Sequence, residues 1–177
     1  MHGRGGQGVV TASLILAQAA FEEGFYAQAI PFFGFERRGA PVMASVRIDR
    51  EPITIRAHIR NPDCVMVMDH SLLLSTRVNV FEGLKGEGVA VINAPKPVEL
   101  KVKPSKLGLV DATGITMKLL GTPLVGIPML GAFSAVTGAV GLDSVIKAVK
   151  LKLGGKAVEG TIEAVKEAYQ RVEVVKP

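Results

Sequence analysis

The amino-acid sequence predicts an α/β fold, a mixed and largely parallel sheet with helices packed on it. Short, continuously apolar runs recur in the middle of the chain, as in buried parallel strands. Segments with helical periodicity stand beside them, and alternating apolar and polar residues further upstream indicate antiparallel pairing. With 177 residues, 48% of them apolar and 21% charged, the chain is expected to form one globular domain over residues 1–177.

The N-terminal part of the chain predicts a helix and a first strand. Residues 9–23 are rich in Ala, Leu and Ile, and Gly24 follows as a natural helix end. Apolar residues lie nearly all round this helix, so we expect it to be buried on more than one side. A short strand is expected at residues 26–30.

Two further extended segments are predicted after an irregular loop at residues 31–39. Apolar and polar residues alternate over residues 42–48 and again over residues 53–59. The polar residues 49–52 between them are typical of a hairpin connection. We therefore expect two adjacent antiparallel strands in this region.

Three buried parallel strands are predicted in the middle of the chain, each followed by an acidic or amide residue. They comprise residues 64–68 followed by Asp69, residues 89–92 followed by Asn93, and residues 107–110 followed by Asp111. Residues 72–84 have helical character. Strands that alternate with helices indicate a sheet covered on both faces.

The C-terminal part of the chain begins with residues 119–142, which carry no charge. Their number would fit a membrane span, but two prolines and five glycines interrupt the segment. We therefore expect no span, but a buried loop followed by a tightly packed helix that is suited to face another subunit. Residues 142–153 and 158–172 then predict two amphipathic helices, separated by two glycines. The start of the chain lacks the apolar run of a signal peptide, so we expect a cytoplasmic protein.

The composition argues against several classes of function. The 21 Lys and Arg residues exceed the 16 Asp and Glu residues by only five, and the chain has no Trp, so nucleic-acid binding is not favoured. A single cysteine, Cys64, cannot form an internal disulfide, a CxxC metal site or an iron–sulfur cluster. His2, His58 and His70 lack the spacing of metal ligands. We therefore expect neither catalytic residues nor a metal site in this chain.

A glycine-rich motif at the start of the chain is the strongest candidate for a binding site. In Gly3-Arg4-Gly5-Gly6-Gln7-Gly8, three glycines fit GxGxxG, a pattern that brings backbone N–H groups and the positive end of a helix to an anion. Only two residues precede the motif, and no carboxylate ends the second strand, so a nicotinamide dinucleotide is disfavoured. A tight turn that serves packing alone stays open as the alternative.

Other polar residues are candidates for a supporting role. Arg37 and Arg38 could hold a phosphate or carboxylate, or equally form a salt bridge to a neighbouring subunit. Asp69, Asn93 and Asp111 follow predicted parallel strands, where α/β folds place ligands. Helix capping is the preferred interpretation for these three residues.

Five sequence motifs together resemble a known family. They are Gly3-Arg4-Gly5-Gly6-Gln7-Gly8-Val9, Gly34-Phe35-Glu36-Arg37-Arg38-Gly39-Ala40-Pro41-Val42, Asn61-Pro62-Asp63, Val110-Asp111-Ala112-Thr113 and Pro128-Met129-Leu130-Gly131-Ala132-Phe133. Their order resembles the gamma chain of 2-oxoacid:ferredoxin oxidoreductases, particularly the pyruvate synthase type. Family members usually begin with a strand before the glycine loop, whereas only Met1 and His2 precede it here.

The resemblance implies a role within a hetero-oligomeric enzyme. Such complexes oxidatively decarboxylate a 2-oxoacid on thiamine diphosphate, reduce ferredoxin through iron–sulfur clusters and release acyl-CoA. It implies that thiamine diphosphate and the clusters lie on partner chains of the alpha, beta and delta types, and that this chain is inactive alone. It also implies that residues 3–8, with Arg37 and Arg38, cradle the phosphates of coenzyme A. A non-catalytic assembly subunit, or a branched-chain 2-oxoacid in place of pyruvate, is the alternative.

Overall fold

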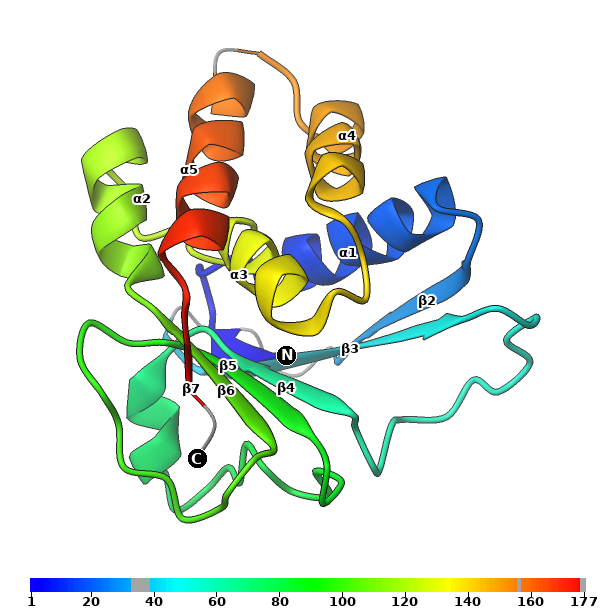
Figure 1. Cartoon of the computed structure of the whole chain (residues 1–177), viewed down its shortest axis with the longest axis vertical. Coiled ribbons are helices and arrows are strands. Elements are labelled where there is room, and N and C mark those ends of the chain that lie inside the picture. Colours follow the sequence, from blue (N-terminus) through cyan, green and yellow to red (C-terminus); the bar gives the residue numbers. More distant parts are fainter. Residues whose placement is uncertain (33–38, 156, 176–177) are drawn as a thin grey trace.

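The computed structural model describes residues 1–32, 39–155 and 157–175 and contains a seven-stranded mixed sheet of order β2-β3-β1-β4-β5-β6-β7 (Figure 1). The strands are β1 (His2–Arg4), β2 (Tyr26–Pro31), β3 (Pro41–Asp49), β4 (Cys64–Val67), β5 (Val89–Asn93), β6 (Lys106–Val110) and β7 (Glu173–Val175). Strands β1, β4, β5 and β6 run parallel, and the pairs β2–β3, β3–β1 and β6–β7 are antiparallel. The predicted mixed α/β fold is confirmed, including its three central parallel strands.

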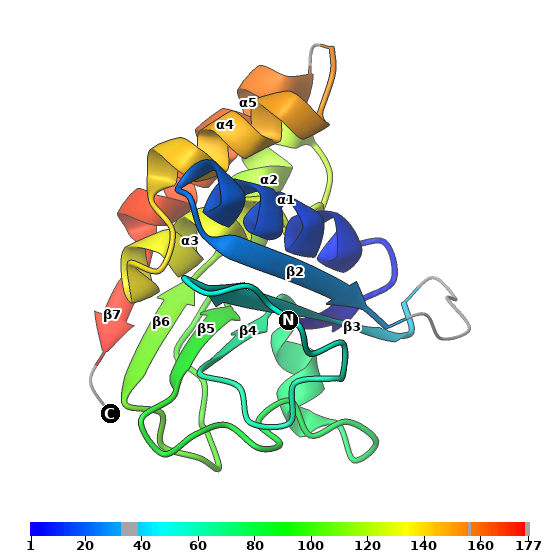
Figure 2. The ribbon, with the colours of Figure 1, turned by 90° about the vertical axis from the view of Figure 1, so that its right-hand side faces the viewer.

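The two faces of the sheet are covered by different structures. The helices α1 (Val9–Glu22), α2 (Ala112–Leu120), α3 (Pro128–Thr137), α4 (Leu142–Lys152) and α5 (Ala157–Arg171) all lie on one side (Figures 1 and 2). The other face is covered by the short 3-10 helix η1 (His70–Leu74) and by loops. Alternation along β4 separates the two cores, because Met66 packs with the α-helices and Val65 and Val67 pack with the η1 side.

The predicted helix at residues 72–84 is wrong beyond Leu74. Side chains in this region satisfy the backbone locally, so they compete with helix formation. The Ser75 hydroxyl oxygen accepts from the N–H groups of Arg77 and Val78, each at 3.2 Å, and the side-chain oxygen of Asn79 accepts from the N–H of Phe81 at 3.2 Å. The segment therefore forms successive turns after η1.

The predicted second strand of a hairpin, residues 53–59, is also wrong. Strand β3 pairs through residues 41–43 with β1 and through residues 44–49 with β2, and residues 53–59 form no ladder with either part of it. Residues 53–59 instead form an irregular, largely exposed segment. The Arg47 guanidinium holds this segment by donating to the carbonyl oxygens of Ile55 at 3.1 Å and Ala57 at 2.6 Å.

The helices largely follow the sequence expectations. Helix α1 ends before Gly24 and is covered on more than one side, by β2, β3 and α4, as predicted, while Leu14 is 40% exposed and Phe21 65% exposed. Helix α3 is the tightly packed helix expected within residues 119–142, and its Gly131 lies against the backbone of α5. The amphipathic helices α4 and α5 are both present. In the described part of the chain, no helix is both long enough and apolar enough to cross a bilayer.

Candidate functional site

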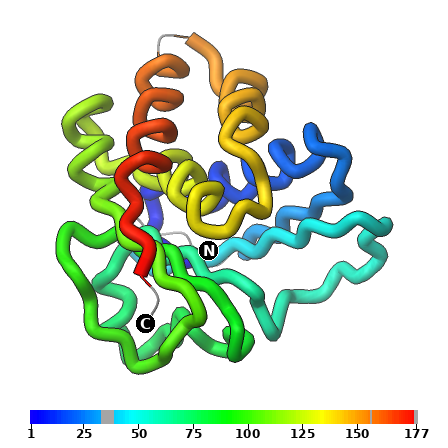
Figure 3. The backbone as a smooth tube through the Cα atoms, in the orientation of Figure 1, coloured from blue at the N-terminus to red at the C-terminus, as the bar shows by residue number. Residues whose placement is uncertain are grey.

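The glycine motif forms the connection from β1 to α1, at the carboxyl end of the parallel strands. Gly3 and Arg4 belong to β1 itself, so a short strand does lead into the turn, and the motif supplies part of it. This strand lies in the middle of the sheet (Figure 3), where the N–H of Met68 donates to the carbonyl oxygen of His2 at 2.7 Å. The turn therefore rests on a central strand, as in α/β proteins that bind ligands at this edge.

Packing explains several of the glycines in and around the turn. A Cβ atom on Gly3 would lie 2.6 Å from the Cγ2 atom of Val9, and Gly8 has a φ of +83°. Gly126, from the loop before α3, lies directly against the turn and donates its N–H to the carbonyl oxygen of Gln7 at 2.9 Å. Gly6 is different, because it is exposed, has a φ of +95° and has no atom of the described residues within 4 Å of the position of a Cβ atom.

Backbone N–H groups at the turn are available for an anion. The N–H of Gly5 donates to the carbonyl oxygen of Ala40 at 2.9 Å. Among the described residues, the N–H groups of Gly6, Gly8 and Val9 donate to no acceptor, and no side chain caps α1. The positive end of the α1 dipole lies at the same place. The turn thus combines several free donors with an uncovered approach at Gly6.

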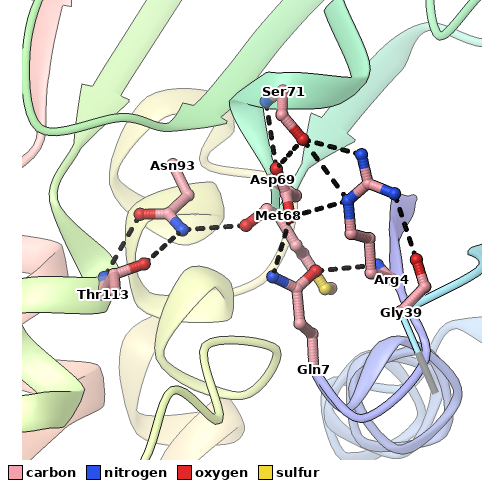
Figure 4. A network of polar contacts seen from close by, with 8 residues as sticks. All are labelled: Arg4, Gln7, Gly39, Met68, Asp69, Ser71, Asn93 and Thr113. Atoms are coloured by element: carbon pink, nitrogen blue, oxygen red, sulfur yellow. Dashed lines mark hydrogen bonds and ion pairs between the residues drawn. The ribbon is translucent and has the colours of Figure 1, made fainter. Parts of the chain in front are cut away.

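The Arg4 side chain is engaged within the protein (Figure 4). Its Nε atom lies 3.1 Å from an Asp69 carboxylate oxygen, Nη2 donates to the Ser71 hydroxyl at 2.8 Å, and Nη1 donates to the carbonyl oxygen of Gly39 at 3.0 Å. The Gln7 amide accepts from the N–H of Arg4 at 2.7 Å and donates to Asp69 at 3.3 Å. Arg4 therefore braces the turn, and Asp69 balances its charge.

The network also sets the protonation state of Asp69. Partial burial would by itself raise the pKa of this carboxyl group. The hydrogen bonds from the hydroxyl and N–H of Ser71, then the charge of Arg4 and the amide of Gln7, outweigh burial and hold the pKa of Asp69 below its usual value. Asp69 is consequently ionised at neutral pH, and it also caps η1.

The other two residues at the strand ends have structural partners. Asn93 is 3% exposed, and its side-chain nitrogen donates to the carbonyl oxygen of Met68 at 2.8 Å and to the Thr113 hydroxyl at 2.9 Å. Asp111 caps α2 by accepting from the N–H of Gly114 at 2.8 Å, which confirms the preferred capping interpretation for this residue. Figure 4 shows that the Asn93 cluster lies next to the Arg4 network, with Met68 between them.

Two predicted arginines and two polar residues that the sequence did not reveal also belong to this edge of the sheet. Arg37 and Arg38 lie outside the described residues, although Gly39 and Ala40, which follow them in the chain, both bond to the turn. Sequence reasoning missed Ser71 and Thr113. A signal for Ser71 was its place two residues after a strand-ending Asp, the spacing at which a Ser N–H bonds back to the carboxylate.

A large cavity lies at the opposite, amino edge of the central strands. It measures about 780 Å³, and His2, His58 and Cys64 line it. Burial lowers the pKa of His2 to about 3 and raises the pKa of the Cys64 thiol to about 12, so both groups are neutral at pH 7. His58 stacks on Phe32 with ring centroids 3.8 Å apart. Nowhere in the described ranges do three His, Cys, Asp or Glu side chains converge to hold a metal ion.

Comparisons with known proteins point to one family. Residues 1–171 match the family described as pyruvate ferredoxin/flavodoxin oxidoreductase. The chain is 52% identical over 172 residues to pyruvate synthase subunit PorC of Methanothermobacter thermautotrophicus, covering 97% of this chain and 93% of the relative. It is 50% identical over 178 residues to the pyruvate/ketoisovalerate oxidoreductases common subunit gamma of Pyrococcus furiosus, covering 98% and 95%.

Solved structures agree on the fold. The crystal structure of pyruvate oxidoreductase subunit PORC from Thermotoga maritima superposes with a TM-score of 0.84 at 35% identity, covering 98% of this chain and 94% of that one. A 2-oxoglutarate:ferredoxin oxidoreductase from Magnetococcus marinus, solved with 2-oxoglutarate, coenzyme A and succinyl-CoA bound, gives a TM-score of 0.69 at 16% identity. This chain covers 29% of the Magnetococcus protein, and the likeness concerns the fold alone.

Proposed function

The chain belongs to the pyruvate ferredoxin/flavodoxin oxidoreductase family as a gamma subunit, and from that premise we propose that its β1–α1 turn binds the phosphates of coenzyme A. The enzyme is a multi-chain complex, in which we place thiamine diphosphate and the iron–sulfur clusters on alpha, beta and delta-type partner chains. Ferredoxin then meets the complex through those partners. This division of labour is consistent with a single cysteine in the present sequence.

The 2-oxoacid is proposed to be pyruvate, with a branched-chain 2-oxoacid as the alternative. The Pyrococcus relative is named as a gamma subunit common to pyruvate and ketoisovalerate oxidoreductases. One gamma chain can thus serve two substrates there. We infer that the pocket that selects the 2-oxoacid lies on other subunits.

The observation that carries the proposal is the open, donor-rich turn at Gly6. Coenzyme A is a polyanion, and backbone N–H groups at a helix N-terminus bind phosphate without needing a cationic side chain. The N–H groups of Gly6, Gly8 and Val9 have no other acceptor among the described residues. Because Asp69 compensates the charge of Arg4, the main chain supplies most of the attraction, and Arg4 fixes the shape of the turn.

A second candidate, an assembly subunit without a ligand, is favoured by a different observation. Close packing requires Gly3 and Gly126, and a φ of +83° favours glycine at Gly8, all of which a purely structural turn would also need. Gly6 separates the two candidates. No atom of the described residues lies within 4 Å of a Cβ position on Gly6, so a side chain there would change the approach to the turn without a steric clash, and its φ of +95° makes backbone strain the effect that a control has to match.

The test is to replace Gly6 by Asp in the assembled complex, with Gly24→Asp as the matched control. Gly24 lies at the other end of α1, with a φ of +84° and the same open surroundings. A carboxylate about 4 Å from a phosphate costs roughly 1 to 4 kcal/mol, so Gly6→Asp should raise the KM for coenzyme A at least about fivefold. The control should leave this KM unchanged. If both variants assemble and share the wild-type KM, the assembly subunit is the correct alternative.

A further inference from the structure

The sheet has a space of one strand's width beside the N-terminal end of β1. Strand β1 lies between β3 and β4, but both neighbours continue past it, β3 through residues 44–49 and β4 through residues 64–66. Figures 1 and 2 show the N-terminus between these two strands. Neighbouring strands lie about 4.8 Å apart, so β3 and β4, which both flank β1, are about 10 Å apart and leave room for one strand. We call this space the slot.

The cavity of about 780 Å³ described above lies in the slot. Val46 of β3 and Met66 of β4 line it from the two sides. Leu16 and Phe133, which belong to the core beneath the α-helices, line it on one face of the sheet, and Val80, from the core on the η1 side, lines it on the other. The cavity therefore lies in the plane of the sheet, between its two covering layers.

Backbone groups of β3 face the slot without a partner. The N–H of Ala44 donates to the carbonyl oxygen of Met1 at 3.1 Å, and the Met1 nitrogen donates to the carbonyl oxygen of Ala44 at 2.9 Å. Alternate residues of an extended strand direct their backbone groups to the same side, so those of Val46 and Ile48 face the slot. They make no hydrogen bond within the ranges 1–32, 39–155 and 157–175.

The facing edge of β4 is unpaired in the same way. The N–H of Met68 donates to the carbonyl oxygen of His2 at 2.7 Å, so Met66 and Cys64 also direct their backbone groups toward β1 and the slot. The N–H of Met66 and both backbone groups of Cys64 lie beyond the end of β1, and in the part of the chain that the structure describes they have no partner. Met66 is 2% exposed, and buried backbone groups without a partner destabilise a fold.

We propose that the slot receives an extended segment of about four residues joined to the nitrogen of Met1, which continues β1 parallel to β4 and antiparallel to β3. Alternation fixes its register. The first and third residues ahead of Met1 bond to β4, at Met66 and Cys64, and the second and fourth bond to β3, at Val46 and Ile48. The segment thus uses each of the free groups described above. Because β1 leads into the glycine turn, it also steadies the strand on which that turn rests.

A segment joined to Met1 suits the slot better than a segment of another subunit. The Met1 nitrogen lies inside the protein, where burial lowers the pKa of the amine to about 6. A separate segment in the same register is interrupted at this nitrogen. A joined segment continues the ladder without a break and turns the amine into an amide, which keeps the bond to Ala44 and carries no charge to bury.

The two faces of the slot determine the side chains that fit. The second residue ahead of Met1 lies opposite Val46 and faces the core beneath the α-helices, and the fourth lies opposite Ile48 on the same face. The first and third lie opposite Ser45 and Arg47, on the other face. We therefore expect apolar side chains at the second and fourth positions and polar side chains at the first and third.

The experiment compares two chains that carry four residues ahead of Met1, each after an initiating methionine. One carries Ile-Thr-Ile-Thr, and its matched control carries Thr-Ile-Thr-Ile, which has the same composition on the opposite faces. Ile-Thr-Ile-Thr should raise the thermal unfolding midpoint by about 5 °C or more over the chain that begins at Met1. It should also slow hydrogen exchange of the Val46, Ile48 and Met66 amides at least about a hundredfold. The control should leave the midpoint within about 2 °C and these amides unprotected.

Three results would overturn the inference. The first is the same midpoint for the two extended chains, because the slot would then not select a strand in this register. The second is slow exchange of the three amides in the chain that begins at Met1, since the slot would already be closed. The third is protection of these amides in that chain once partner subunits are added, which would make a segment of another subunit the occupant. None of these measurements involves coenzyme A, so the proposed function can fail without affecting them.

Discussion

Replacing Gly126 by Ala places a methyl group against the glycine turn, from the loop that precedes α3. The new Cβ atom would lie 2.5 Å from the carbonyl oxygen of Gly8 and 2.8 Å from that of Gln7. The first distance is 0.9 Å short of the 3.4 Å at which ordinary contact begins. Both close neighbours are backbone atoms, so the turn or the loop must move as a unit.

The expected losses of stability and of activity follow from this displacement. Overpacking of a well-packed site costs about 1 to 3 kcal/mol, and we expect a loss of about 2 kcal/mol in the free energy of unfolding. For a chain of this size, that lowers the unfolding midpoint by about 4 to 8 °C. A shift of a binding turn by about 1 Å can reduce rates about a hundredfold, so kcat/KM for coenzyme A should fall at least about tenfold in the complex.

The assay is urea unfolding of the chain together with steady-state kinetics of the complex at varied coenzyme A. Gly86→Ala is the control, because Gly86 is exposed and has nothing within 4 Å of a Cβ position. If Gly126→Ala matches Gly86→Ala in both stability and kinetics, the close packing of the loop on the turn does not matter as inferred here.

Three further predictions concern titratable groups. Asp69→Asn should lower the free energy of unfolding by about 1 kcal/mol at pH 7, since it removes the charge partner of Arg4. Because the pKa of Asp69 is lowered in the folded chain, urea unfolding should show this difference from the wild type vanishing as the pH falls below about 4. Burial lowers the pKa of His2 to about 3, so the contribution of neutral His2 to the free energy of unfolding is intact above about pH 6.5 and is about 2 kcal/mol smaller at pH 5. A His2→Gln chain whose free energy of unfolding has the same pH dependence as the wild type would contradict this. The pKa of Cys64 is about 12, so iodoacetamide at pH 8 should alkylate it at least about a hundredfold more slowly than a free cysteine until urea unfolds the chain.

Much of the fold could be predicted because its signals are local. The apolar runs of β4, β5 and β6 and the glycine after α1 indicate these elements without reference to the rest of the chain. Residues 53–59 could not be placed, because alternation identifies a strand-like face but not whether the segment pairs with a neighbouring strand. The helix prediction for residues 75–84 was wrong for another reason, since the Ser and Asn side chains there accept hydrogen bonds from nearby backbone N–H groups and compete with a helix.

The candidate site was predicted in part. The glycine turn was found from its motif, and its role toward coenzyme A stays a prediction, as do the roles of Arg37 and Arg38. The pairing of Arg4 with Asp69 joins residues 65 positions apart, so only the parallel arrangement of β1 and β4 brings them together. A free, phosphate-binding Arg4 was therefore a natural expectation from the motif, and the neutralising carboxylate could be seen only in three dimensions.

The position of β1 has a consequence for how the chain folds. This strand has three residues and joins β3 on one side to β4 on the other, partners about 40 and 65 positions away. Contacts of such long range form late, because loop closure has to be paid for before they stabilise anything. The β2–β3 hairpin and the parallel strands can each collapse earlier on their own. The turn after β1 therefore takes shape only when the two halves of the sheet have met, so an incompletely folded chain has no formed turn to offer an anion.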